Sequence, residues 1–244
     1  MSQNLLAENL THWDYIDRYS KWMYDVYSDY IGKSVFDVGA GMGRMVDFYI
    51  REVEKVTATD IFQEQVDFMN KRFEQYPYFH AELVDILKDA LEEYEGKFDT
   101  VLCINVLEHL SDDYKAVGNM KYILRDGGVL ILMVPAFQKL YCRLDSAVNH
   151  YRRYDPGRLV DIAEKNRMEI IRHHYFNILG IIPYWLKGKS RKGQAGSFSL
   201  SLNESNSRIY NFAAGIMEPI EKRFPPGIGL TEVIILRKQY ENHN

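Results

Sequence analysis

The chain has 244 residues, 46% of them hydrophobic and 26% charged, with a formal net charge of −4 and a sequence pI near 6.0. This length suits one large α/β domain, and the lack of a basic excess argues against a nucleic-acid-binding protein. Two isolated cysteines, Cys103 and Cys142, indicate neither a disulfide scaffold nor a metal site. We find no signal-peptide pattern, and the longest apolar stretch, 178–186, is about half of the ~20 residues that span a bilayer. We therefore expect a cytoplasmic protein without a transmembrane segment.

The first 31 residues are predicted to be helical, because aromatic and apolar side chains recur at i, i+3 and i+4 spacing. We expect this stripe mainly to pack on the domain. The alternative is a helical lid over the ligand, in which Tyr19 and Trp22 would bind an acceptor.

A regular alternation of strands and helices follows. Residues 34–38 predict a strand buried on both faces, followed by a glycine turn and a helix to about residue 52. Further strands are expected at 55–59, 78–84, 98–104 and 129–134, with helices at 63–74 and 114–124. This β-α rhythm predicts an α/β fold with a doubly wound, mostly parallel sheet.

The rhythm loosens after Pro135. A long polar connection occupies 136–154, and a helix at 156–167 and a strand at 169–175 follow it. The segment 176–229 looks irregular, with a helix near 207–223, and 231–238 predicts the last strand. We expect a single domain over 1–244, with 1–31 as an N-terminal lid and 176–229 as an acceptor-side insertion.

Polar residues follow the early strands at their carboxyl ends, where a parallel sheet binds its ligands. They are Asp37, Asp60, Asp85 and Asn105. Asp60 is placed to accept hydrogen bonds from both hydroxyls of a ribose, and Asp85 from an adenine amino group while Ile86 packs on the ring. A nucleotide-containing ligand is therefore predicted.

The glycine spacing distinguishes S-adenosylmethionine (SAM) from a dinucleotide. A dinucleotide turn requires G-x-G-x-x-G, but Arg44 occupies the third glycine position and Gly43 comes one residue early. Asp37, two residues before the first glycine, suits the cationic amino and sulfonium groups of SAM better than a pyrophosphate. A nicotinamide-dependent oxidoreductase is therefore the weaker alternative.

These motifs resemble those of the class I SAM-dependent methyltransferases over about residues 34–238. Residues 37–43 (DVGAGMG) match the D/E-x-G-x-G-x-G signature, and 84–86 (VDI), 105–110 (NVLEHL) and 124–130 (LRDGGVL) resemble later motifs. The resemblance implies a Rossmann-like seven-stranded sheet of order 3-2-1-4-5-7-6 with an antiparallel strand 7. It also implies that SAM is bound by Asp37, Gly39, Ala40, Gly41, Gly43, Asp60, Ile61, Asp85, Ile86 and Asn105.

Methyl transfer needs alignment, desolvation and, for some acceptors, a base. Glu108, His109 and His150 are the candidate catalytic residues, and the alternative for the first two is a helix cap. Some related enzymes use E-x-x-E-H as part of a metal site, but Asn105 replaces the first acid here, so we expect no metal.

The segment 144–154 (LDSAVNHYRRY) resembles a D-x-x-x-G-H-Y-R-R-Y run of a bacterial methyltransferase subgroup associated with natural-product and cell-surface glycan pathways. Asn149 replaces the glycine, and asparagine tolerates a left-handed backbone. The acceptor is expected to contact Tyr141, Tyr151, Arg152 and Arg153, with His150 handling the proton. Alternatively, the arginines pair with Asp145 and Asp155 to pin the loop.

The apolar run 178–186 and its basic tail (187–192) favour a cover over the acceptor pocket or a dimer contact, and a peripheral membrane contact is the alternative. We thus expect a SAM-dependent methyltransferase that acts on an O, N or C atom of a small molecule, such as a natural product or a glycan or lipid-linked precursor. It would be a monomer or homodimer that binds no nucleic acid. A non-catalytic SAM-binding protein is the alternative from another functional class.

Overall fold

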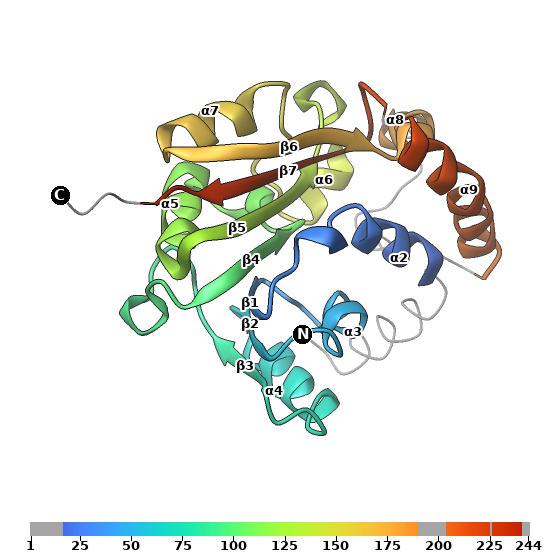
Figure 1. The fold of residues 1–244 in the computed structure, drawn as a ribbon. Helices are drawn as coiled ribbons and strands as arrows, with labels where there is room; N and C mark the ends of the chain where they lie inside the picture. Colours follow the sequence, from blue (N-terminus) through green and yellow to red (C-terminus); the bar gives the residue numbers. More distant parts are fainter. Residues whose placement is uncertain (1–16, 190–203, 225, 241–244) are drawn as a thin grey trace.

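The computed structural model describes residues 17–189, 204–224 and 226–240, and one seven-stranded sheet runs through them (Figure 1). The strands lie in the order β3 (Phe79–Leu83), β2 (Lys55–Asp60), β1 (Ser34–Val38), β4 (Phe98–Ile104), β5 (Leu124–Pro135), β7 (Thr231–Lys238) and β6 (Met168–Phe176). The first five are mutually parallel, and β7 is antiparallel to both β5 and β6. The predicted strand order and the antiparallel strand 7 are confirmed.

Helices cover both faces of this sheet, as Figure 1 shows. One layer holds α2 (Asp17–Asp25), α3 (Val46–Tyr49), α4 (Gln63–Arg72) and α9 (Glu204–Arg223). The other holds α5 (Asp113–Ile123) and α7 (Arg158–Lys165). In β5, Leu132 packs in the second layer and the neighbouring Met133 in the first, because successive side chains of a strand point to opposite faces. This two-sided burial explains the nearly continuous apolar runs in the central strands.

The structure differs from expectation chiefly in the connections. The helix after the glycine turn is only Val46–Tyr49, because Gly39, Gly41 and Gly43 all have positive φ and delay its start. The connection after β5 contains α6 (Arg143–Ala147), and α8 (Ile181–Lys189) lies in the segment predicted to be irregular. Short 3₁₀ helices fill other turns: η1 (Ser28–Tyr30), η2 (Glu92–Tyr94), η3 (Leu107–His109), η4 (Gln138–Leu140) and η5 (Ile178–Gly180).

The predicted helical lid lies partly outside the described residues, since residues 1–16 are not among them. Its described part, α2, packs against α9. No described helix is both long and apolar enough to cross a bilayer. Cys103 and Cys142 are both free thiols, as expected.

Candidate active site

A cavity of about 840 Å³ opens at the carboxyl ends of β1, β2 and β4. This volume lies within the usual range for small-molecule sites, about 300–1,000 Å³. Most of the residues predicted to bind SAM line the cavity, namely Gly39, Gly41, Asp60, Ile61, Asp85, Ile86 and Asn105. Asp37, Ala40 and Gly43 do not line it.

The glycine loop is shaped so that its backbone forms part of the cavity wall. Gly39 has φ +66°, and a Cβ on it would lie 2.6 Å from a methyl carbon of Val106. Gly41 has φ +60°, and a Cβ there would meet only Gln65, at 4.0 Å, so the Gly41 backbone faces open space. The loop is tied to the next strand by Ala40, whose N–H donates to the carbonyl of Thr59 at 2.8 Å. A ligand can therefore approach the main chain at Gly41.

Asp60 is held rigidly at the tip of β2. One carboxylate oxygen accepts from the N–H of Gly41 at 3.0 Å, and the other from the N–H of Phe62 at 3.1 Å. Burial raises the pKa of this carboxyl above its ordinary value, and those two backbone N–H groups oppose the shift. Asp60 thus presents a preorganised acceptor that also fixes the glycine loop.

The tip of β3 offers a second carboxylate beside an apolar side chain. Asp85 accepts from the N–H of Leu87 at 3.0 Å and from the ammonium of Lys88 at 2.6 Å. Burial alone would raise its pKa, but these hydrogen bonds hold the pKa of Asp85 below the usual value. Ile86 lines the cavity next to it, and Phe62, at the neighbouring tip of β2, exposes 56% of its surface. Apolar groups at both strand tips suit a flat ring.

Asp37 lies beneath the loop and is almost fully buried. Its carboxylate accepts from the hydroxyl of Tyr49 at 2.8 Å. Burial raises the pKa of Asp37 to about 7, although the Tyr49 hydrogen bond lowers it, and the nearby Asp60 raises it further. A cation bound in the cavity would favour the ionised form of this carboxyl.

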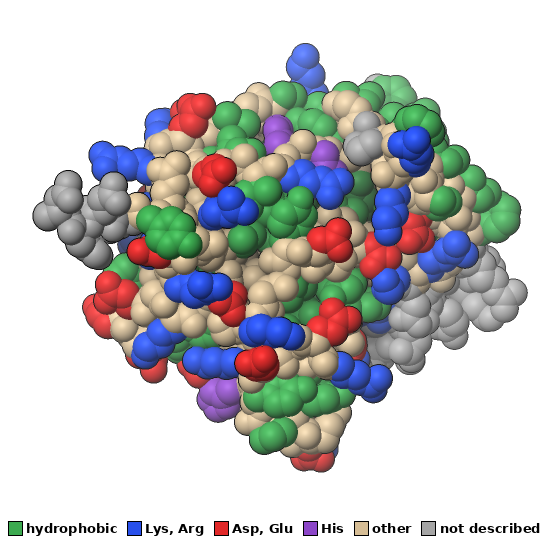
Figure 2. Space-filling view, viewed as in Figure 1, with side chains coloured by type: hydrophobic (Ala, Val, Ile, Leu, Met, Phe, Trp, Pro, Cys, Tyr) green, Lys and Arg blue, Asp and Glu red, His purple; other side chains and the backbone are tan. Residues whose placement is uncertain are grey.

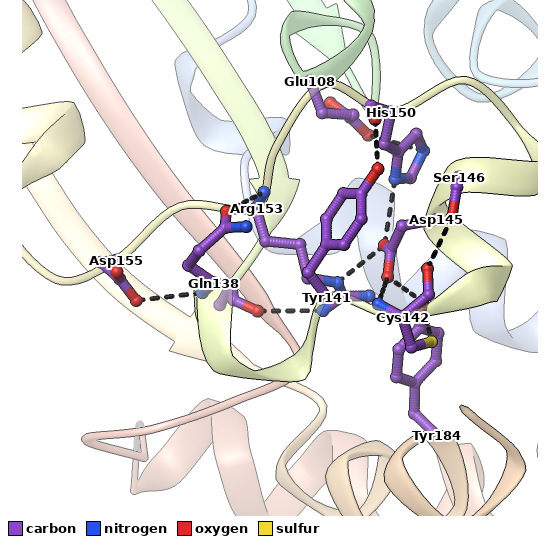
Figure 3. Close-up of polar contacts among 11 residues, drawn as sticks. Glu108, Gln138, Tyr141, Cys142, Asp145, Ser146, His150, Arg153, Asp155 and Tyr184 are labelled. Atoms are coloured by element: carbon purple, nitrogen blue, oxygen red, sulfur yellow. Dashed lines mark hydrogen bonds and ion pairs between the residues drawn. The ribbon is translucent and has the colours of Figure 1, made fainter. Parts of the chain in front are cut away.

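At the other end of the cavity, His150 belongs to a buried ionic network centred on Asp145 (Figure 3). The Nδ1 of His150 lies 3.1 Å from Asp145 Oδ1, and the Nε of Arg153 donates to the same oxygen at 2.8 Å. The second oxygen accepts from the N–H of Cys142 at 2.9 Å and the hydroxyl of Tyr184 at 2.8 Å. Burial would raise the pKa of Asp145, but the His150 hydrogen bond and the Arg153 charge hold it well below the usual range.

This arrangement fixes the tautomer of His150. Because a carboxylate can only accept, Nδ1 must carry the proton, and Nε2 is left as the basic nitrogen. Asn149 before it has φ +62°, so the left-handed backbone that asparagine tolerates is confirmed.

Glu108, His109 and His150 form the acceptor-end cluster, in which one ligand atom from each lies within 4.8 Å of the others. His150 Nε2 is 3.9 Å from Glu108 Oε1, and the two imidazole rings lie 4.5 Å apart edge to face. Burial raises the pKa of Glu108 to about 8, and its Oε2 has no hydrogen-bond partner among the described residues. Burial and the charge of His150 lower the pKa of His109. The structure therefore brings the three candidate catalytic residues together, although His150 comes from a distant loop.

The remaining predicted acceptor residues divide into two groups. Tyr141 and Tyr151 line the cavity, and Tyr151 is 61% exposed. Arg152 and Arg153 do not line it. Arg152 donates to the carbonyls of Leu110 and Ser111 and pairs with Asp113, and the buried Arg153 pairs with Asp145.

These arginine contacts favour the alternative that both residues pin the loop. One partner differs from expectation. Asp155 accepts instead from the backbone N–H of Gln138 at 2.9 Å.

Tyr19 and Trp22 lie away from this cavity. Trp22 is 5% exposed and packs edge to face on Phe176 at 5.4 Å, and the hydroxyl of Tyr19 accepts from Asn177 at 3.2 Å. Their i, i+3 spacing is that of a packing stripe, and in the structure both residues pack on the protein outside the cavity.

Sequence reasoning missed Phe62 and Gln65, which line the cavity. Their positions just after the acid at the β2 tip are the signal that could have indicated them, because residues that follow a strand tip lie at the ligand-binding edge of the sheet.

Comparisons with known proteins agree with this geometry. Residues 36–130 match the family model described as "Methyltransferase domain". The ubiquinone biosynthesis O-methyltransferase of Actinobacillus pleuropneumoniae serotype 7 is 29% identical over 103 residues, which cover 41% of this chain and 44% of that protein. The non-reducing polyketide synthase trt4 of Aspergillus terreus is 28% identical over 107 residues, or 41% of this chain and 4% of that protein. The chain thus spans less than half the length of these relatives.

A solved structure of a geranyl diphosphate methyltransferase in complex with SAM is similar in fold, with a TM-score of 0.63 and 14% identity, covering 89% of this chain and 84% of that chain. Residues 36–130 are therefore similar to a methyltransferase domain, and the chain has the fold of the class I SAM-dependent methyltransferases. The cavity fits SAM, since it combines an open glycine backbone with fixed carboxylates at two strand tips.

Proposed function

We propose that the chain is a SAM-dependent methyltransferase that methylates a hydroxyl oxygen of a small molecule. The observation that carries this proposal is the position of His150, which lines the same cavity as the strand-tip carboxylates and is backed by Asp145. A natural product or a glycan or lipid-linked precursor would be the acceptor.

The cofactor would lie along the strand tips. Asp60 would accept from the ribose hydroxyls, and Asp85 from the adenine amino group while Ile86 packs on the ring. Gly39 and Gly41 would line the methionine part, above the buried Asp37. Phe62, which the sequence did not point to, is placed to cover the adenine from the β2 side.

The chain's own residues supply proton transfer and alignment. When bound, SAM would supply a methyl group on a positively charged sulfur, which would keep the electron pair of the C–S bond and leave as a neutral thioether. His150 Nε2 would take the proton of the acceptor hydroxyl during this transfer. Asp145 stabilises the imidazolium that forms, and Arg153 keeps Asp145 ionised.

A base narrows the class of acceptor. The sulfonium has a neutral thioether as its leaving group, so a neutral amine needs no base before attack, whereas a hydroxyl or a carbon acid must lose its proton to become an effective nucleophile. The buried support of His150 therefore argues against a neutral amine, and of the two remaining classes we propose the hydroxyl. Tyr141 and Tyr151, which line the same end of the cavity, suit a ring-bearing acceptor.

The test is transfer of a tritiated methyl group from SAM to a panel of phenols, glycosides and prenylated phenols. We expect O-methylated products from the wild type and a loss of about 10²–10⁴ in kcat for His150→Ala. Lys165→Ala, on the exposed side of α7, is the matched control and should leave kcat unchanged. SAM binding without transfer to any acceptor would instead favour the non-catalytic alternative, and N- or C-methylated products would refute the hydroxyl acceptor.

A further inference from the structure

Helix α9 carries an exposed apolar stripe that the proposed chemistry does not use. Phe212, Ile216, Ile220 and Phe224 recur every four residues and expose 71%, 49%, 48% and 70% of their surface. At i, i+4 spacing they lie on one side of the helix. Exposing an apolar stripe of this kind to water costs free energy unless another apolar surface covers it.

The opposite side of α9 is anchored in the protein. Ala214 is buried in the core beneath it. The carboxylate of Glu221 accepts from the N–H groups of Asn177 and Ile178 at 2.8 and 3.0 Å, and Glu218 lies 4.0 Å from Arg18. The rotation of α9 is thus fixed with the stripe outward.

Helix α8 and the turn before it extend the apolar surface. Leu179, Ile182, Trp185 and Leu186 expose 52%, 65%, 45% and 56% of their surface, and Ile228 exposes 52%. Of the sixteen large hydrophobic side chains exposed among the described residues, nine lie within 179–228. We call these nine the α8–α9 face. Figure 2 shows hydrophobic side chains together with Lys and Arg side chains over α8 and α9 at the upper right.

Basic side chains lie at the α9 end of the α8–α9 face. Lys222 and Arg223 are exposed at the end of the stripe. Within 211–228 the only acids are Glu218 and Glu221, and both contact the body of the protein. Apolar side chains flanked by Lys and Arg, with an exposed Trp among them, are typical of helices that lie in a membrane interface.

The face adjoins the acceptor end of the active site. Tyr184 of α8 points inward, where its hydroxyl donates to Asp145 at 2.8 Å and its ring lies 4.2 Å from the guanidinium of Arg153. The neighbouring Trp185 and Leu186 are exposed. One helix therefore connects the exposed apolar surface to the carboxylate that positions His150.

We propose that the α8–α9 face binds an anionic lipid surface and brings the mouth of the active site to acceptors held in that surface. A second copy of the chain fits this face less well, because the described residues of 211–228 offer no outward-facing acid to pair with Lys222 and Arg223. Anionic headgroups supply that charge, and acyl chains cover the apolar stripe. This proposal goes beyond the methyl-transfer reaction, and a binding assay tests it without any turnover.

The experiment is flotation of the full chain with vesicles of phosphatidylcholine, with and without phosphatidylglycerol. The wild type should float with the anionic vesicles and less so in high salt. The triple variant Ile216→Asn, Ile220→Asn, Phe224→Ser should bind about tenfold more weakly or worse. Tyr122→Ser with Tyr240→Ser, which removes exposed rings elsewhere, is the matched control and should float as the wild type does.

Two further measurements keep the proposal falsifiable if the triple variant is misfolded by circular dichroism. Lys222→Glu with Arg223→Glu should reduce binding to anionic vesicles only. Lipids brominated in their acyl chains should quench tryptophan emission, and Trp185→Phe should lose that quenching. Failure of the wild type to float would overturn the proposal. The proposal would also be overturned if sedimentation velocity showed the wild type to be a dimer and the triple variant a monomer, and neither protein bound vesicles.

Discussion

Replacing Glu108 by glutamine tests the electrostatics of the acceptor-end cluster. The change keeps the shape of the side chain and removes its titrating group. Burial raises the pKa of Glu108 to about 8 from the ordinary value of 4.5, so the folded state holds a proton that the unfolded state releases. A raised carboxyl pKa means that stability falls as pH rises from about 4.5 to 8. The amide of the Glu108→Gln variant does not titrate, so the variant lacks this part of the pH dependence.

The magnitude follows from the two pKa values. Each pH unit between the two pKa values lowers the free energy of unfolding by about 1.4 kcal/mol, and partial titration near pH 8 reduces this loss. Between pH 6 and pH 8 the free energy of unfolding of the wild type should therefore fall by about 2 kcal/mol relative to that of the Glu108→Gln variant. The difference between the two proteins cancels the contributions of the other titrating groups to the pH dependence. One of these groups is Asp37, whose pKa is also raised, to about 7.

The assay is urea unfolding at pH 6, 7 and 8, with the free energy of unfolding extrapolated to water. Glu169→Gln, an exposed carboxylate paired loosely with Arg237 at 3.5 Å, is the matched control and should follow the wild type at every pH. If the Glu108→Gln profile runs parallel to that of the wild type, the carboxyl of Glu108 is ionised in the folded protein, and the electrostatic account of this end of the cavity is wrong.

Four more results are expected. Asp60→Asn should weaken SAM binding at least about tenfold by calorimetry, since hydrogen bonds to a charged group contribute about 1.5–3 kcal/mol, whereas Asp67→Asn on the exposed side of α4 should not. SAM affinity should rise between pH 6 and 8 as Asp37 ionises, with proton release on binding, and Asp37→Asn should abolish this slope. Asp145→Asn should lower the free energy of unfolding by about 3–5 kcal/mol, because it leaves a buried guanidinium without its carboxylate, and a midpoint within error of the wild type would contradict that. Methyl transfer should survive dialysis against EDTA, and restoration of lost activity by Mg²⁺ or Zn²⁺ would instead place an ion in the acceptor-end cluster.

The sequence predicts the sheet well, because local patterns determine it. Residues 34–38, 98–104 and 231–238 form strands with the expected bounds, since buried β-branched and apolar runs end at turn residues. The strand tips that carry Asp60 and Asp85 are predictable for the same reason. Carboxyl ends of parallel strands meet at one edge, so order along the chain predicts proximity there.

The acceptor end could not be predicted in the same way. The sequence offered the pairing of Arg153 with Asp145 only as an alternative to acceptor binding, and the fold is needed to choose between the two. Tyr184 comes from a separate segment, so its contact with Asp145 is seen only in the fold. The spacing of Tyr19 and Trp22 fits a lid and a packing stripe equally well, because periodicity gives the face of a helix and not what lies against it. Helix α8 could not be predicted for a related reason, because a short apolar run is compatible with a helix, a strand or a loop.

Calorimetric titration of the full chain with SAM, S-adenosylhomocysteine and NAD tests the central claim most directly. The glycine backbone at Gly41 and the carboxylates at the tips of β2 and β3 predict that SAM and S-adenosylhomocysteine bind at one site and that NAD does not bind. Binding of NAD with no affinity for SAM would contradict the account.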